Sequence, residues 1–115
     1  MPIPGIPQPP LLLVDPTLRL RQYDGRPDFA LSWYQDQELL RLVDGPEAEP
    51  YTRQDLRDMF EYYQRRGEVY WIEVLEQGEF VPVGDVTFLQ HDLPIVIGEP
   101  SYRGIGIGSK VVAAL

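Results

Sequence analysis

The most informative segment for the architecture is LPIVIGEPSYRGIGIGSKVV, residues 93–112. It opens with a continuous apolar run at 93–98, which is typical of a central strand buried on both faces of a sheet. Pro94 is expected at the beginning of that strand, because proline cannot donate to a ladder. A glycine-rich segment follows at 103–108, and the apolar residues of 109–115 then suit a helix packed on the sheet. The stretch therefore predicts a buried strand, a glycine-rich loop and a helix.

The first part of the chain predicts a tail, a strand and a helix. Residues 1–16 contain six prolines, and we expect an extended tail there. LRLRQY at 18–23 alternates apolar and polar side chains as a half-buried strand does. Asp28 then caps a helical stretch that ends at DGP, residues 44–46. The apolar residues that recur at roughly helical intervals in it are Leu31, Tyr34, Leu39, Leu42 and Val43.

A second helix has clearer boundary signals. Thr52 and Asp55 form a start that resembles a capping box, in which each residue satisfies a backbone N–H of the other. Apolar residues then lie on one face, and Gly67 supplies the stop. Two helices are therefore expected between the first strand and the next.

An antiparallel hairpin is predicted after this helix. VYWIEVL at 69–75 is rich in β-branched and aromatic residues, and FVPVGDVTFL at 80–89 is its partner across the turn EQGE at 76–79. Because Pro82 and Gly84 weaken a regular ladder, an edge position or a bulge is expected near the start of the second strand.

These elements predict one domain of the α/β (α+β) class over residues 17–115. Its sheet has about four, mainly antiparallel strands, with two helices after the first strand and a third helix after the glycine-rich loop. The length of 115 residues and the hydrophobic content of 43% suit a single core.

Composition excludes several classes of function. The net charge of -8 disfavours nucleic acid and anionic membrane surfaces as partners and favours cationic ligands. The absence of cysteine excludes disulfides and thiolate chemistry, and a single His91 leaves little for zinc, so no metal is expected. The N-terminal apolar run is too short for a signal core or a membrane span, which favours a cytoplasmic location.

The segment Arg103-Gly104-Ile105-Gly106-Ile107-Gly108 is expected to bind an anion. Its glycines allow a tight turn, and the unpaired N–H groups of a loop and a first helical turn attract a diphosphate. A Walker A loop does not fit, because Lys110 follows Gly108 by two residues and no Ser or Thr comes after it. The Rossmann pattern fails as well, because the glycines run GxGxG.

The remaining pattern, R/Q-x-x-G-x-G/A, is matched by Arg103, Gly106 and Gly108. IVIGEPSYRGIGIGSKVV resembles the fourth strand, the coenzyme A pyrophosphate loop and the next helix of the GNAT superfamily of N-acetyltransferases. LRLRQYDGRPDFALSWYQDQELL is similar to the first strand and helix of that family, especially of its aminoglycoside-type and other small-molecule enzymes.

The resemblance implies acetyl-CoA as co-substrate and a primary amine of a small, cationic acceptor. It places pantetheine along the backbone of the fourth strand and the pyrophosphate on the loop amides, with a cation from Arg103. The residues implied are Val96, Ile97, Gly98, Arg103, Gly104, Ile105, Gly106, Ile107, Gly108 and Ser109. One strand N–H would polarise the thioester carbonyl as the amine attacks.

An alkylammonium must lose a proton before it attacks, so a carboxylate is the expected base. Asp92 matches the position of a glutamate in several relatives, although a turn role explains it as well. Glu99 is the second candidate. Trp33, Tyr34 and Asp36 would wall the acceptor site by resemblance, whereas the simpler interpretation of the chain's aromatic residues is a core.

Complete members of the family continue well beyond the loop helix, so the resemblance implies a domain that is truncated here. Two functions remain open: an acetyltransferase present as a truncated form, and a half-domain that self-associates or binds a partner without catalysis. The exposed edge of the fourth strand favours association in either case, and a homodimer is expected.

Overall fold

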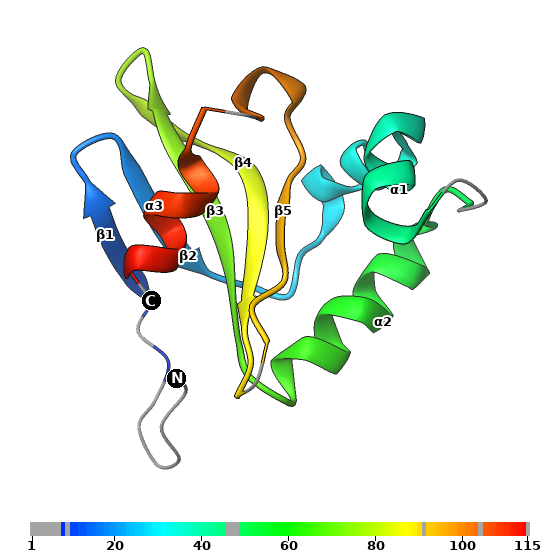
Figure 1. The fold of residues 1–115 in the computed structure, drawn as a ribbon. Coiled ribbons are helices and arrows are strands. Elements are labelled where there is room, and N and C mark those ends of the chain that lie inside the picture. The colour runs from blue at the N-terminus through cyan, green and yellow to red at the C-terminus, as the bar shows by residue number, and fades with distance from the viewer. Residues whose placement is uncertain (1–7, 9, 46–48, 91, 104, 115) are drawn as a thin grey trace.

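The computed structural model describes residues 8, 10–45, 49–90, 92–103 and 105–114. They form an antiparallel five-stranded sheet in the order β1-β2-β3-β4-β5, with helices on both of its faces (Figure 1). The strands are β1 (Leu11–Asp15), β2 (Leu18–Gln22), β3 (Glu68–Glu76), β4 (Glu79–Phe88) and β5 (Ile95–Ile97). The helices are α1 (Gln37–Asp44), α2 (Arg53–Gln64) and α3 (Ile107–Ala114), and short 3-10 turns are η1 (Asp28–Ala30), η2 (Trp33–Gln35) and η3 (Pro100–Tyr102). The α+β class, the two helices after the predicted first strand and the third helix after the loop are confirmed.

The sheet has one strand more than the sequence predicted, because β1 lies within the expected extended tail. Pro10 and Pro16 flank Leu11–Asp15, and no proline interrupts it, so each of its residues can take part in a ladder. β1 pairs with β2 as an edge strand, and the backbone N–H of Gln22 also donates to the carbonyl of Pro10 at 3.0 Å. The tail therefore contributes its last residues to the sheet.

The segment between β2 and α1 is not the continuous helix predicted from Asp28. It forms η1 and η2, and α1 begins only at Gln37. Asp36 has an extended backbone conformation, with ψ of 120°, and its carboxylate accepts the N–H of Glu38 at 3.0 Å. Asp36, and not Asp28, is thus the cap of the helix, because an extended residue that supplies a side-chain acceptor both ends one turn and starts the next.

The signals for α2 and the hairpin are confirmed. Thr52 and Asp55 form a capping box, and Gln77 and Gly78 take positive φ values of 48° and 84° at the hairpin tip. The register of β3 and β4 shifts between Ile72 and Glu73, which leaves Val83 as the extra residue of a bulge. The predicted bulge is therefore present, although β4 lies inside the sheet and not at its edge.

β5 was expected to be a central strand buried on both faces, and this prediction is wrong for the described residues. Ile95–Ile97 pair with β4 on one side only, no strand of the described part of the chain pairs with their other side, and all three residues are half-buried. An apolar run indicates burial of side chains, which helices can provide, and does not by itself indicate two neighbouring strands.

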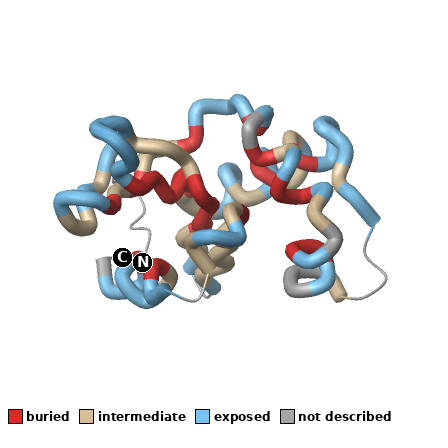
Figure 2. The backbone as a smooth tube through the Cα atoms, turned by 90° about the horizontal axis from the view of Figure 1, so that it is seen from above, coloured by how far each residue is buried: buried red, intermediate tan, exposed pale blue. Residues whose placement is uncertain are grey.

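Two apolar cores lie on opposite faces of the sheet. On one face, Ile107 and Val111 of α3 pack against a cluster centred on β2, β3 and β4. On the other, α1, α2, η1 and η2 cover an aromatic cluster that includes Trp33, Tyr34 and Trp71. Figure 2 shows the buried positions concentrated along the strands between these two layers.

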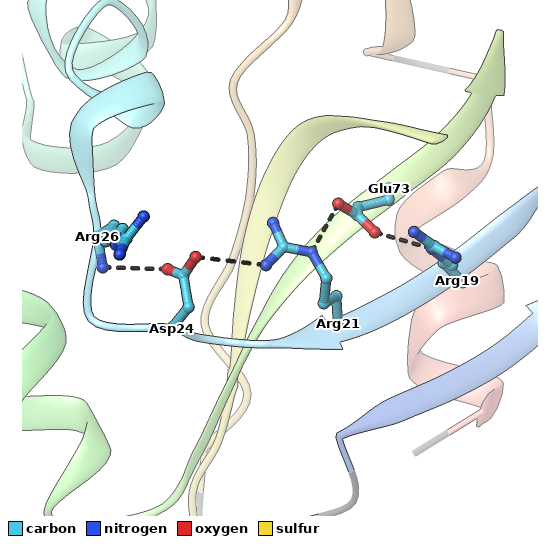
Figure 3. A network of polar contacts seen from close by, with 5 residues as sticks. All are labelled: Arg19, Arg21, Asp24, Arg26 and Glu73. Atoms are coloured by element: carbon cyan, nitrogen blue, oxygen red, sulfur yellow. Dashed lines mark hydrogen bonds and ion pairs between the residues drawn. The ribbon is translucent and has the colours of Figure 1, made fainter. Parts of the chain in front are cut away.

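A charged network lies between β2 and β3 on the sheet face that α1 and α2 cover (Figure 3). The buried carboxylate of Glu73 accepts hydrogen bonds from Arg19 Nε and Arg21 Nε, each at 2.8 Å. Arg21 also lies 3.5 Å from Asp24. Glu73 is thus buried as a fully paired ion.

Candidate functional site

The C-terminal end of β5 combines an open backbone edge with a close-packed face. The Gly98 N–H donates to the carbonyl of Val83 at 2.7 Å, and Val96 stands opposite Asp85 in the ladder. Because antiparallel partners alternate, Ile97 directs its N–H and C=O away from β4. Among the three residues expected to hold pantetheine, Ile97 is therefore the one whose backbone faces the open edge.

Gly98 is required by the side chain that covers it. A Cβ on Gly98 would overlap the indole ring of Trp33, which lies directly on the backbone there. The Trp33 Nε1–H donates to Glu99 Oε1 at 2.8 Å, so the same indole also orients the next side chain. The structure thus brings together Trp33, expected in the acceptor wall, and Glu99, a candidate base.

Arg103 points back to this strand end. Its Nε donates to the carbonyl of Ile97 at 2.8 Å and its Nη2 donates to the carbonyl of Gly98 at 3.1 Å. Nη2 also lies 3.7 Å from Asp36 Oδ2, and Nη1 lies 3.9 Å from Glu38 Oε1. The guanidinium therefore joins β5 to the N-terminus of α1.

The loop itself leads from η3 into the first turn of α3. Gly106 has a φ of 88°, a left-handed conformation that favours glycine, and its carbonyl accepts the Lys110 N–H at 3.2 Å. The first N–H groups of α3, those of Ile107, Gly108 and Ser109, have no acceptor within the helix and carry its positive dipole end. Ile105 is exposed beside them, whereas Ile107 is buried in the core. Gly104 lies outside the described residues.

Tyr34 of η2 and Asp85 of β4, which stands opposite Val96 of β5, form a buried pair that the sequence did not predict. The Tyr34 hydroxyl donates to Asp85 Oδ2 at 2.8 Å. Burial raises the pKa of Asp85 to about 7, while the hydrogen bond from Tyr34 lowers it. Burial also raises the pKa of Tyr34 well above its usual range, with a further contribution from the charge of Asp85. An acid between apolar residues, Asp85 beside Val83 and Val86, was the available signal.

Asp92 lies at the other end of β5 from this cluster. Its carboxylate accepts the N–H of Leu93 at 2.8 Å, and its carbonyl accepts the N–H of Leu89 at 3.0 Å. These bonds support the turn interpretation of Asp92. The two candidate bases, Asp92 and Glu99, are thus separated by the full length of the strand, and only Glu99 lies beside the loop and the expected acceptor wall.

Glu99 also lines a cleft of about 270 Å³ where β4, the end of β3 and η3 meet. Glu76 and Ser101 line the same cleft, and the hydroxyl of Tyr102, a third lining residue, donates to the Glu76 carboxylate. Two carboxylates, those of Glu76 and Glu99, therefore line this cleft.

The core interpretation of the aromatic residues is confirmed for Trp33, Tyr34, Tyr70 and Trp71, which are all buried. No helix in the described part of the chain is long and apolar enough to cross a membrane. Nor do the described residues contain a group of three or more His, Cys, Asp or Glu side chains placed to hold a metal ion.

No family model matches the sequence. No curated protein matches it either. The fold, however, is similar to that of solved GNAT acetyltransferases. An acetyltransferase of the GNAT family from Bacillus anthracis superposes with a TM-score of 0.66 at 17% identity, over 90% of this chain and 62% of that one. RimL, the ribosomal L7/L12 α-N-protein acetyltransferase solved with coenzyme A, superposes with a TM-score of 0.63 at 21% identity, over 90% of this chain and 64% of that one.

A third structure, the acetyltransferase from Salmonella typhimurium that modifies the N-terminal serine of ribosomal protein L7/L12, gives a TM-score of 0.60 at 20% identity. The superposition includes 90% of this chain and 64% of that protein. The chain thus has a GNAT-like fold and spans less than two thirds of the length of these three proteins.

Proposed function

We propose that this chain carries the acetyl-CoA binding part of an N-acetyltransferase. The proposal depends on one observation: the open edge of β5 is followed along the chain by η3, the Gly106 turn and the N-terminus of α3. The strand edge can pair with a ligand segment that contains amides, and the N–H groups at the helix N-terminus can bind a diphosphate. Pantetheine and the diphosphate of coenzyme A have these two chemistries.

In this proposal the backbone does most of the binding. The Ile97 N–H meets the pantetheine arm or the thioester carbonyl, where a fixed donor stabilises the charge that develops during acyl transfer. The N–H groups of Ile107, Gly108 and Ser109 bind the diphosphate, with Ile105 and Gly106 shaping the turn. No metal is assigned a role.

The acceptor is proposed to be a primary amine of a small cationic molecule, such as a polyamine or an aminoglycoside. Glu99 supports this, because its carboxylate is held by Trp33 at the end of β5 and lines an acidic cleft. There it could accept the proton that the ammonium loses before attack. A second candidate is the α-amine of a protein, which is the acceptor named for two of the similar structures.

Isothermal titration of the chain with coenzyme A tests the coenzyme proposal. Gly106→Ala strains a left-handed position, and we expect at least a tenfold loss of affinity because the loop amides turn away. Gly78→Ala introduces the same strain at the hairpin tip, where φ is 84°, and serves as the matched control with unchanged affinity. No binding by the unaltered chain, or equal losses in the two variants, would contradict the proposal.

The acceptor is tested by acetyl-CoA turnover, measured as thiol release, in the presence of spermidine, an aminoglycoside or a peptide with a free N-terminal serine. Release with either cation alone supports the small-molecule acceptor, whereas release with the peptide alone supports the protein acceptor. The alternative of a half-domain that only associates predicts no release, together with a dimer in light scattering.

A further inference from the structure

We infer that the Arg103 side chain is a positioning residue that holds residues 33–36 against the end of β5, and not a ligand of the diphosphate. The inference rests on the proposed function in one respect, since it takes the edge of β5 as the path of pantetheine. It differs from the expectation, drawn from the resemblance, that the guanidinium supplies a cation to the phosphates.

The donors of Arg103 are directed to the strand. Nε and Nη2 bind two consecutive carbonyls, those of Ile97 and Gly98, at 2.8 and 3.1 Å. A planar fork of donors suits two such neighbouring acceptors, because its geometry is fixed before it binds. The side chain is 18% exposed, so most of the guanidinium is withdrawn from the solvent in which an incoming phosphate would meet it.

The same guanidinium faces the start of α1. Asp36 uses Oδ1 to cap the helix, accepting the Glu38 N–H at 3.0 Å, and its Oδ2 lies 3.7 Å from Arg103 Nη2. One carboxylate therefore connects the helix N-terminus to the strand end through Arg103. Because Trp33 lies on Gly98 in the same segment, residues 33–36 contact β5 both by packing and by charge.

These contacts set where a strand-like ligand can bind. The carbonyl of Ile97 faces the open edge and already accepts a hydrogen bond from Arg103, so a ligand running along β5 would share that carbonyl with Arg103, whereas it would meet the Ile97 N–H directly. Arg103 thus occupies the end of this edge, and in this inference it sets the register of the arm relative to residues 33–36. Its loss should weaken recognition of the arm, with or without a diphosphate attached.

The test compares the affinity of the chain for coenzyme A and for pantetheine, which lacks the diphosphate. For Arg103→Gln we expect both affinities to fall by the same factor, about three- to tenfold, as for the loss of charge-assisted hydrogen bonds. Arg103→Lys keeps the charge but not the fork, and should lose affinity similarly. A loss confined to coenzyme A, and restored by lysine, would overturn the inference.

Two further variants separate positioning from charge. Asp36→Asn keeps a cap acceptor but removes the carboxylate that faces Arg103. When it is combined with Arg103→Gln, we expect no further loss of affinity. If the two losses of affinity multiply independently, the connection between Asp36 and Arg103 is contradicted. Lys110→Gln removes a cation from the first turns of α3, where Lys110 pairs with Asp15 at 3.2 Å, and controls for the change of charge. It should leave pantetheine binding unchanged.

Hydrogen exchange gives a readout that needs no ligand. Arg103→Gln should speed exchange of the backbone amides at 38–41 by about threefold or more, although these residues are remote in sequence, while amides of α2 stay protected. Unchanged exchange at 38–41 would refute the positioning role. Failure of the unaltered chain to bind either ligand would instead refute the proposed function, and this exchange experiment would still decide the role of Arg103.

Discussion

Two carboxylates are buried on the sheet face that α1 and α2 cover, one between β2 and β3 and one on β4 next to β5. Their surroundings contrast. Glu73 on β3 accepts hydrogen bonds from two arginines, whereas Asp85 on β4 accepts one from the neutral hydroxyl of Tyr34. The two acids have similar exposures, 3% and 4%. The pKa of Asp85 nevertheless rises to about 7 through burial, because no cation in the described contacts offsets the loss of solvent.

The two sites differ in what replaces the lost solvent, which is two arginines at Glu73 and one neutral hydroxyl at Asp85. Burying an ion is costly unless charges and hydrogen bonds replace the lost water. Asp85 is therefore an acid that is easily protonated, and it lies on β4, next to the strand that is proposed to bind the coenzyme.

The largest expected effect is that of Glu73→Gln. The amide loses the charge that two arginines share, so we expect a loss of about 2 kcal/mol in the free energy of unfolding at pH 7. Urea denaturation measures it. Glu79→Gln, at an exposed position of the hairpin, is the control and should change stability little. A neutral result for Glu73→Gln would show that the arginines gain as much from water as from the carboxylate.

Tyr34→Phe tests the other buried carboxylate. Removing the hydroxyl leaves Asp85 without its hydrogen bond, which we expect to cost about 1.5 kcal/mol. The hydrogen bond also lowers the pKa of Asp85, so its loss should raise that pKa. The stability of the variant should then keep falling at a pH above 7.5, where that of the unaltered chain has levelled. Denaturation curves from pH 6 to 9 would reveal an identical profile if Asp85 were ionised independently of Tyr34.

Asp85→Asn is expected to have the smallest effect and the opposite sign to Glu73→Gln. The pKa of Asp85 is raised on folding from 3.8 to about 7. The stability that its protonated form contributes is therefore fully present below the unfolded pKa and is lost as the pH rises through about 7. The unaltered chain should lose about 1 kcal/mol between pH 6 and 8, and the variant should not. A variant that is less stable than the unaltered chain at pH 8 would show that the ionised form is accommodated.

The capping box of α2, the hairpin at 76–79, the bulge in β4 and the strand–loop–helix order at the end of the chain could all be predicted, because each depends on neighbouring residues. Thr52 and Asp55 lie within one helical turn of each other. Gly78 and Gly106 stand where the backbone takes a positive φ, which glycine favours. Sequence reasoning failed where the deciding contact was distant. β1 needed β2 to pair with, and the helix expected from Asp28 was displaced to Asp36.

Composition, periodicity and backbone sterics act over short stretches, and they were enough to predict the sheet-and-helix class, the glycine-rich turn at the start of α3 and an acidic surface. Packing between segments that are distant in the sequence was needed to bring Glu99 to Trp33, Arg103 to β5 and Asp85 to Tyr34. These pairs are separated by up to 66 positions along the chain, and their geometry depends on how the helices settle on the sheet. The ionisation of Asp85 follows from the same packing, since solvent exclusion is a property of the assembled fold.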